Sequence, residues 1–178
     1  MIISVEKAKE LIAFTDSWTD EKIRMKLLAV EQTIRAYTNN NFQKRGIRIL
    51  ADIRDGAFVS EYPIPFSVGD TVEVSESQYN AGLFTVSETG DVYFITDEEF
   101  IRDEDDVLVT LVEYPADVGA CCVNLMEWEV HNRAKVGVQS ETLSRHSVTY
   151  FNMGAADQAM GYPVSLLGCL KPYRKARF

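Results

Sequence analysis

The hydrophobic periodicity of this chain changes twice, and this limits the folds open to it more than any other feature. From Thr19 to Tyr37 apolar residues recur every three or four positions, as in a helix with one buried face. From residue 45 to residue 114 they alternate in short runs, as in strands joined by tight turns. From Pro115 the helical period returns. The order predicts an α+β fold in which strands are inserted between helices.

The N-terminal residues predict a helical hairpin. Ser4 can cap a short helix over residues 3–14, and Thr19 can cap a longer one. The phrase TNNNF should end the longer helix, because asparagine tolerates the left-handed conformation of a C-terminal cap. A third, nearly all-apolar helix follows Pro115 and should be central. We expect its residues Cys121, Leu125 and Trp128 to face the stripe formed by Ile23, Leu27 and Ile34.

The middle segment predicts about five short strands, in the phrases IRILADI, GDTVEV, YNAGLFTV, GDVYFIT and VLVTLVEY. They should form a small antiparallel sheet or barrel. The acidic run TDEEFIRDEDD lies between the last two, and we interpret it as a solvated hairpin tip that a short Gly-Ser turn could replace. The predicted fold is therefore a small helical bundle, residues 1–44 and 115–178, with an inserted antiparallel β module at residues 45–114.

Composition excludes several classes of protein. A net charge of -9 argues against a general grip on nucleic acid, which depends on neutralising phosphates. No apolar run is long enough to span a membrane, and Glu6 and Lys7 come too early for a signal peptide. Three cysteines, two of them adjacent, do not indicate a disulfide framework, so a reducing compartment is the simpler interpretation.

Residues able to carry chemistry are few. The cysteines, His131 and His146 lack the spacing of a zinc site or of an activated nucleophile, and no phosphate-binding or nucleophile-turn motif occurs. The acidic run could hold a cation through carboxylates, but it lacks the glycine of a calcium loop. We therefore expect no enzyme activity, no cofactor and no metal.

Two polar segments suggest interaction instead. The stretch from Arg133 to Asn152 follows the apolar helix and alternates like a strand only from Val148. The last residues concentrate positive charge in an acidic chain. We expect residues Ser140–Phe151 and Pro172–Phe178 to be arms, poorly anchored in the lone subunit. The expected contacts with other proteins are made by Ser147, Val148, Thr149, Tyr150, Phe151, Pro172, Tyr173, Arg174, Lys175 and Arg177.

The order of three phrases resembles the head–tail connector, or head-completion, proteins of tailed bacteriophages and prophages. The phrases are VEQTIRAYTNNNF near the start, GVQSETLSRHSVTYFN after the apolar helix, and YPVSLLGCLKPYRKARF at the end. The second supplies Gly137, Val138, Ser140, Glu141, Leu143, Ser147, Val148, Thr149 and Tyr150 to the family pattern; the third supplies Tyr162, Pro163, Leu167, Leu170, Pro172, Tyr173 and Arg174. The β segment departs from the shortest family members.

This resemblance implies a structural protein of the virion, at the head–tail junction, assembled in the bacterial cytoplasm. Such a subunit forms a homo-oligomeric ring on the portal protein and joins the head to the tail or a stopper protein. Genomic DNA passes through the channel without specific binding, and no membrane is involved. Two rival hypotheses remain: a nucleic-acid-binding module built on the small barrel, and a hydrolase that uses Asp103 or Asp105 of the acidic run.

Overall fold

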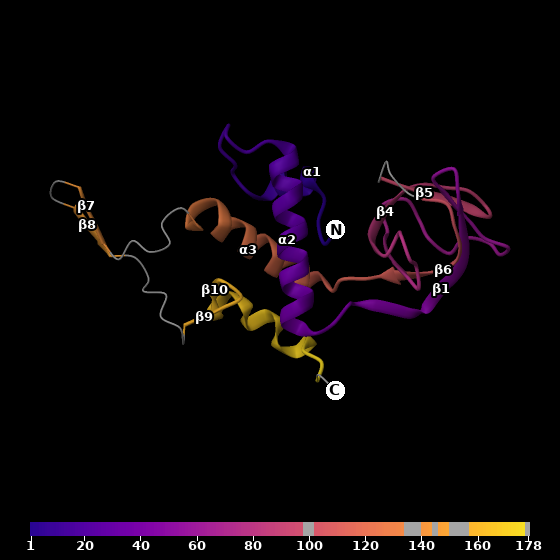
Figure 1. Cartoon of the computed structure of the whole chain (residues 1–178). Helices are drawn as coiled ribbons and strands as arrows, with labels where there is room; N and C mark the ends of the chain where they lie inside the picture. The colour runs from indigo at the N-terminus through magenta and orange to yellow at the C-terminus, as the bar shows by residue number, and fades with distance from the viewer. Residues whose placement is uncertain (98–101, 134–139, 144–145, 150–156, 177–178) are drawn as a thin grey trace. The chain divides into compact units, whose positions relative to one another are not determined.

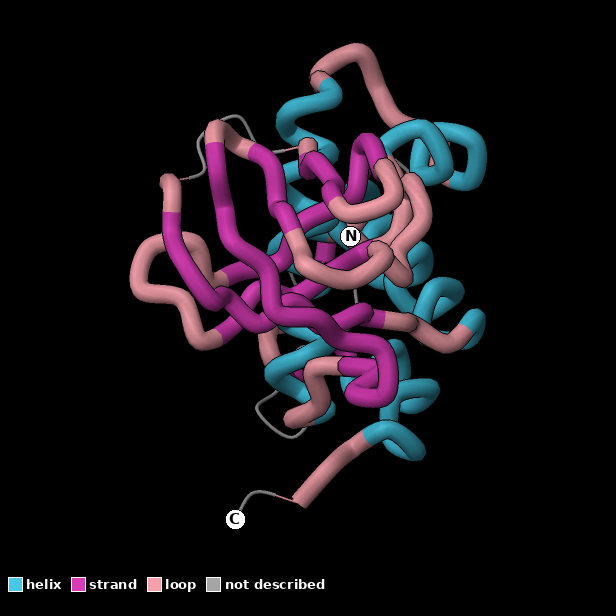
Figure 2. The backbone as a smooth tube through the Cα atoms, turned by 90° about the vertical axis from the view of Figure 1, so that its right-hand side faces the viewer, coloured by secondary structure: helices cyan, strands magenta, loops and turns pink. Residues whose placement is uncertain are grey.

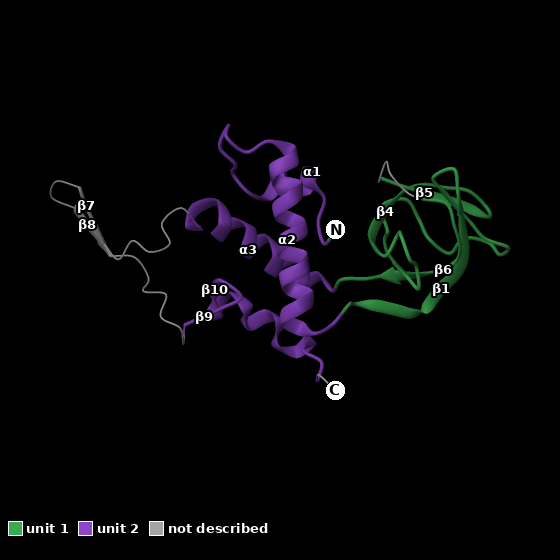
Figure 3. Cartoon of the chain, in the orientation of Figure 1, with its two compact units in different colours: residues 1, 41–114 green, residues 2–40, 115–178 purple. Residues whose placement is uncertain are grey.

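The computed structural model describes residues 1–97, 102–133, 140–143, 146–149 and 157–176 of the 178-residue chain. These divide into two compact units, which are coloured separately in Figure 3. Unit 1 contains Met1 and residues 41–114, and unit 2 contains residues 2–40 and 115–178. The chain therefore leaves a helical unit, forms a β unit, and returns to the helical unit (Figure 1).

Unit 2 is built on three helices, α1 (Val5–Leu11), α2 (Asp20–Thr38) and α3 (Ala116–His131). The predicted caps are confirmed: the Ser4 hydroxyl accepts from the Lys7 N–H at 3.2 Å, and the Thr19 hydroxyl accepts from the Lys22 N–H at 3.3 Å. Helix α2 ends at Asn39, whose φ of 48° is left-handed. The predicted stripe of α2 is buried, and α2 packs against α3.

The C-terminal part of unit 2 contains a strand pair and a 3-10 helix. A short strand pair, β9 (Gln158–Ala159) and β10 (Tyr162–Pro163), precedes the 3-10 helix η2 (Val164–Tyr173). Helix η2 packs against both α2 and α3 and buries Leu167 and Leu170. It therefore completes the core of the helical unit.

Unit 1 is a closed antiparallel barrel in which the strand order is β1-β2-β5-β4-β3-β6 and β6 pairs back to β1. Figure 2 shows the strands curving round on one another. The strands are β1 (Gln43–Arg54), β2 (Ala57–Val59), β3 (Thr71–Ser75), β4 (Gly82–Thr89), β5 (Tyr93–Thr96) and β6 (Glu104–Val112).

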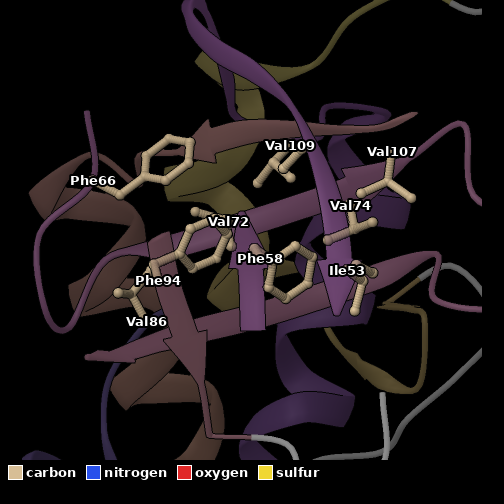
Figure 4. Close-up of a cluster of buried hydrophobic side chains, with 10 residues drawn as sticks. Ile53, Phe58, Phe66, Val72, Val74, Val86, Phe94, Val107 and Val109 are labelled. Carbon is tan, nitrogen blue, oxygen red and sulfur yellow. The ribbon is translucent and has the colours of Figure 1, made fainter. Parts of the chain in front are cut away.

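The barrel has an apolar core of its own. Phe58 and Phe94 stack at its centre with ring centroids 4.6 Å apart, and Phe66 meets Phe94 edge-on at 5.5 Å. Figure 4 shows these rings among the aliphatic side chains that point inward from the surrounding strands. Ten buried residues form the cluster: Ala51, Ile53, Phe58, Phe66, Val72, Val74, Val86, Phe94, Val107 and Val109.

The predicted small helical bundle with an inserted module is wrong. The barrel is closed, six-stranded and prominent, whereas the helices are short. The alternation of apolar residues did not reveal β2, because this strand has only three residues, which are too few to show a period of two. This strand bridges β1 and β5 and so closes the ring of strands.

The interpretation of the acidic run as a hairpin tip is also wrong. It joins β5 to β6, and these strands are not neighbours, because β5 pairs with β2 and β4 while β6 pairs with β1 and β3. Glu104 fixes a different loop, because its carboxylate accepts hydrogen bonds from the Ser77 hydroxyl, the Gln78 N–H and the Asn80 amide. Replacing the whole run would remove these bonds.

Within the described residues, no helix combines the length and the apolar character needed to cross a membrane.

Candidate interaction site

A buried carboxylate at the end of α3 joins three parts of unit 2. Glu129 Oε2 lies 3.1 Å from Lys26 Nζ of α2, and Glu129 Oε1 accepts from Arg133 Nε at 3.0 Å. The same oxygen accepts from the Tyr162 hydroxyl at 2.8 Å. Arg133 also lies over the Trp128 ring, which packs edge-on against the Tyr162 ring. We call Lys26, Trp128, Glu129, Arg133 and Tyr162 the Glu129 cluster.

The Glu129 cluster is held by charge. Burial alone would raise the pKa of Glu129, but hydrogen bonds from Arg133, Tyr162 and Lys26 outweigh it and lower this pKa to about 2. The carboxylate is thus ionised over the whole physiological range. The Glu129 side chain is only 2% exposed, and a buried charge is stable only when it has hydrogen-bonding partners such as these.

The Glu129 cluster holds the two ends of the segment between α3 and β10 close together. Arg133 follows α3, and its Nη1 donates to the carbonyl of Gly161 at 3.2 Å. The chain therefore leaves α3 and returns at β10 beside the same guanidinium. Between these points lie the strands β7 (Ser140–Leu143) and β8 (His146–Thr149), which pair with each other. We call this pair the β7–β8 hairpin.

The described part of the C-terminal tail is anchored on the helical unit, so the expectation of a poorly anchored tail is wrong there. The Tyr173 hydroxyl donates to both oxygens of Asp117, at 2.6 and 2.7 Å. The Lys175 N–H donates to the Thr38 carbonyl at 2.8 Å, and the Arg174 guanidinium lies 5.3 Å from the Tyr37 ring centroid. Arg174 and Lys175 nevertheless keep exposed side chains.

The other predicted contact residues fall into three groups. Ser147, Val148 and Thr149 belong to β8, and Pro172 lies inside η2. Tyr150, Phe151 and Arg177 lie outside the described residues. A role for any of these residues in contacts with another protein stays a prediction.

The pairing of the cysteines differs from the prediction made from the sequence. Cys121 of α3 and Cys169 of η2 form a disulfide, although the count and spacing gave no sign of one. Cys121 thus faces η2, and its sulfur also lies 3.4 Å from the Leu166 carbonyl. Cys122 is a buried free thiol, and burial raises its pKa to about 12, so it is a poor nucleophile.

Sequence reasoning missed the Glu129 cluster. Its one visible signal is the spacing of Glu129 and Arg133, four residues apart near the end of a helix, which favours an ion pair. Nothing in the sequence shows that Tyr162 returns to the same point.

No protein-family model matches the chain, and no curated protein matches it.

Proposed function

We propose that this chain is a non-enzymatic connector subunit of a tailed bacteriophage or prophage. In this proposal several copies form a ring on the portal vertex and join the DNA-filled head to the tail or a stopper protein. The protein would assemble in the bacterial cytoplasm and remain in the virion at the head–tail junction. The proposal starts from the resemblance of three phrases, in order, to that family.

One structural observation supports this proposal most. A ring subunit needs an arm that reaches a neighbour without loosening its own core. Here the two ends of the segment between α3 and β10 are joined by Arg133, which binds Glu129 on one side and Gly161 on the other. The β7–β8 hairpin lies in that segment and, within the described residues, pairs only with itself. A clamped base that carries a separate hairpin is suited to contact between subunits.

The distribution of charge is compatible with a DNA channel. Residues 41–114, which form the barrel, contain 16 acidic residues and five lysines or arginines. The rest of the chain contains 11 acidic residues and 13 lysines or arginines. An acidic barrel would not retain DNA by neutralising its phosphates, so DNA could pass without being held.

A nucleic-acid-binding module is the second candidate, because small closed barrels serve as binding platforms for single strands. The charge of this barrel counts against it, since such platforms use a positively charged groove.

Two binding measurements separate the candidates. Sedimentation of the purified chain with the portal protein of the same phage or prophage should show a complex. Titration with fluorescent single-stranded DNA at physiological salt should show no binding. Binding of DNA together with no complex with portal would overturn the connector proposal in favour of the second candidate.

A further inference from the structure

One edge of the barrel is incompletely paired. Between Arg48 and Ala51, β1 pairs with β6 on one side. On its other side β1 pairs with β2 only at Asp52, Ile53 and Arg54. In the described part of the chain, the stretch 48–51 therefore has a strand neighbour on one side alone.

The chain that follows β2 does not continue along β1. Pro63 and Pro65 have no N–H group and cannot continue a ladder along β1. After Val59 the chain turns away, because the Ser60 N–H donates to the Val92 carbonyl at 2.9 Å and the Ile64 N–H donates to the Asp91 carbonyl at 2.8 Å. The segment that could have covered the edge is thus bonded elsewhere.

The direction of the free peptide groups follows from the hairpin turn. Asp55 and Gly56, with φ values of 50° and 80°, form a two-residue turn closed by the pair Arg54 and Ala57. Hydrogen-bonding direction alternates along a strand. Arg54, Asp52, Leu50 and Arg48 therefore point their N–H and C=O groups toward the β2 side. At Leu50 and Arg48, no strand among the described residues pairs with these groups.

The open edge lies in a groove of about 710 Å³, formed by residues 48–52 and 59–62 together with Asp106. Large apolar side chains are exposed beside it, with Leu50 58%, Val59 38% and Tyr62 70% accessible. One end holds Asp52, which forms an ion pair with Arg54, and Asp106; Glu61 also lines the groove. Free peptide groups, apolar flanks and an acidic end are what an added strand with a basic end would need.

We propose that this groove receives strand β8 from a second copy of the chain. This inference rests on the proposed ring function and names the contact between neighbouring subunits. The four residues of β8 (His146–Thr149) can cover the open stretch 48–51 of β1. A two-stranded hairpin is marginal alone in water, so the β7–β8 hairpin gains most from a third strand.

Charge sets the direction of the added strand. If β8 runs antiparallel to β1, its first residue, His146, meets the end of the open stretch next to Asp52 and Asp106. Arg145 precedes His146 in the sequence, so this direction brings a basic residue to the end of the groove that holds Asp52 and Asp106, whereas a parallel strand would bring it toward Arg48. Each copy gives a hairpin and receives one, so the contact is head-to-tail and can close into a ring.

The test uses the full chain labelled with ¹⁵N, observed by NMR as its concentration rises from about 20 µM to about 1 mM, a range that detects weak association. Backbone amide signals of residues 48–51 and 146–149 should shift together. Leu50→Pro should abolish the shifts, because it removes an N–H that points into the groove while Ile49 and Ala51 keep the ladder to β6. Unchanged signals at both segments in the wild-type chain would overturn the proposal.

A second variant keeps the test independent of proline. Leu50→Asp should weaken the association at least about tenfold, since it places a charge in the apolar part of the groove. Val68→Asp is the matched control, because Val68 is 63% exposed on the same barrel and outside the groove. Equal effects of the two changes would overturn the proposal.

Electron microscopy with portal separates this inference from the function on which it rests. Rings that form equally well with Leu50→Pro would refute strand exchange and leave the connector function standing. Absence of wild-type rings on portal would count against the connector function itself.

Discussion

Replacing Glu129 by glutamine should destabilise the helical unit, and the loss should depend on pH. The change keeps the shape of the side chain and removes its charge. Arg133 and Lys26 then lose their anionic partner, while the Tyr162 hydroxyl can still donate to the amide oxygen. A charge that loses its buried partner is among the more costly changes in a protein.

The size of the effect follows from the pKa of Glu129. The ordinary value is 4.5 and the folded value is about 2. This difference corresponds to about 3 kcal/mol of stability at pH 7. The side chains of Lys26 and Arg133 are 35% and 39% exposed, so water already screens part of the attraction. We therefore expect a loss of about 2–3 kcal/mol at pH 7.

The sign of the pH dependence is fixed by the direction of the shift. Because folding lowers the pKa, the stabilisation is fully present above pH 4.5 and is lost as pH falls toward 2. At pH 3 the difference between wild type and Glu129→Gln should shrink to about 1 kcal/mol.

Urea unfolding followed by tryptophan fluorescence measures this directly. Both tryptophans, Trp18 and Trp128, belong to unit 2, so the signal reports the helical unit and not the barrel. Glu127→Gln is the matched control, because Glu127 is exposed on the same helix. The reasoning fails if Glu129→Gln is as stable as wild type at pH 7, or if its deficit is the same at pH 7 and pH 3.

Three further changes test other parts of the structure. Leu27→Ala should lower the free energy of unfolding by about 2–5 kcal/mol in the same assay, because Leu27 is fully buried; a loss below about half a kilocalorie would mean that the stripe is not core. Glu104→Gln should increase amide hydrogen exchange at residues 77–80 and leave exchange in α3 unchanged, because the carboxylate accepts bonds from that loop; equal exchange in both proteins would show that the loop does not depend on it. Reversing the charge of Arg174 and Lys175 should weaken binding to portal most at low salt; salt-independent binding would remove the tail from the interface.

The helices could be predicted from the sequence because the residues that begin and end them act on near neighbours. Capping by Ser4 and Thr19 and the left-handed Asn39 depend on neighbours within a turn, so residue type alone predicts them. The closed barrel was not accessible, because closure depends on the three-residue strand β2 and on pairing between β1 and β6, which lie far apart in the sequence.

The candidate site was partly predictable for the same reason. The polar stretch after Arg133 stands out by composition, but its clamp does not, since Glu129 and Tyr162 are 33 residues apart. The disulfide between Cys121 and Cys169 spans 48 residues and gave no local sign. Tail anchoring was missed because the partners of Tyr173 and Lys175 come from the ends of α3 and α2.

The central claim is that this chain forms a ring on a portal. The most direct test is electron microscopy of the purified chain mixed with the portal protein of the phage or prophage that encodes it. The account predicts an added ring of density, coaxial with the portal channel and open at its centre. Portal particles that look the same with and without the chain, at concentrations that saturate any complex, would contradict it.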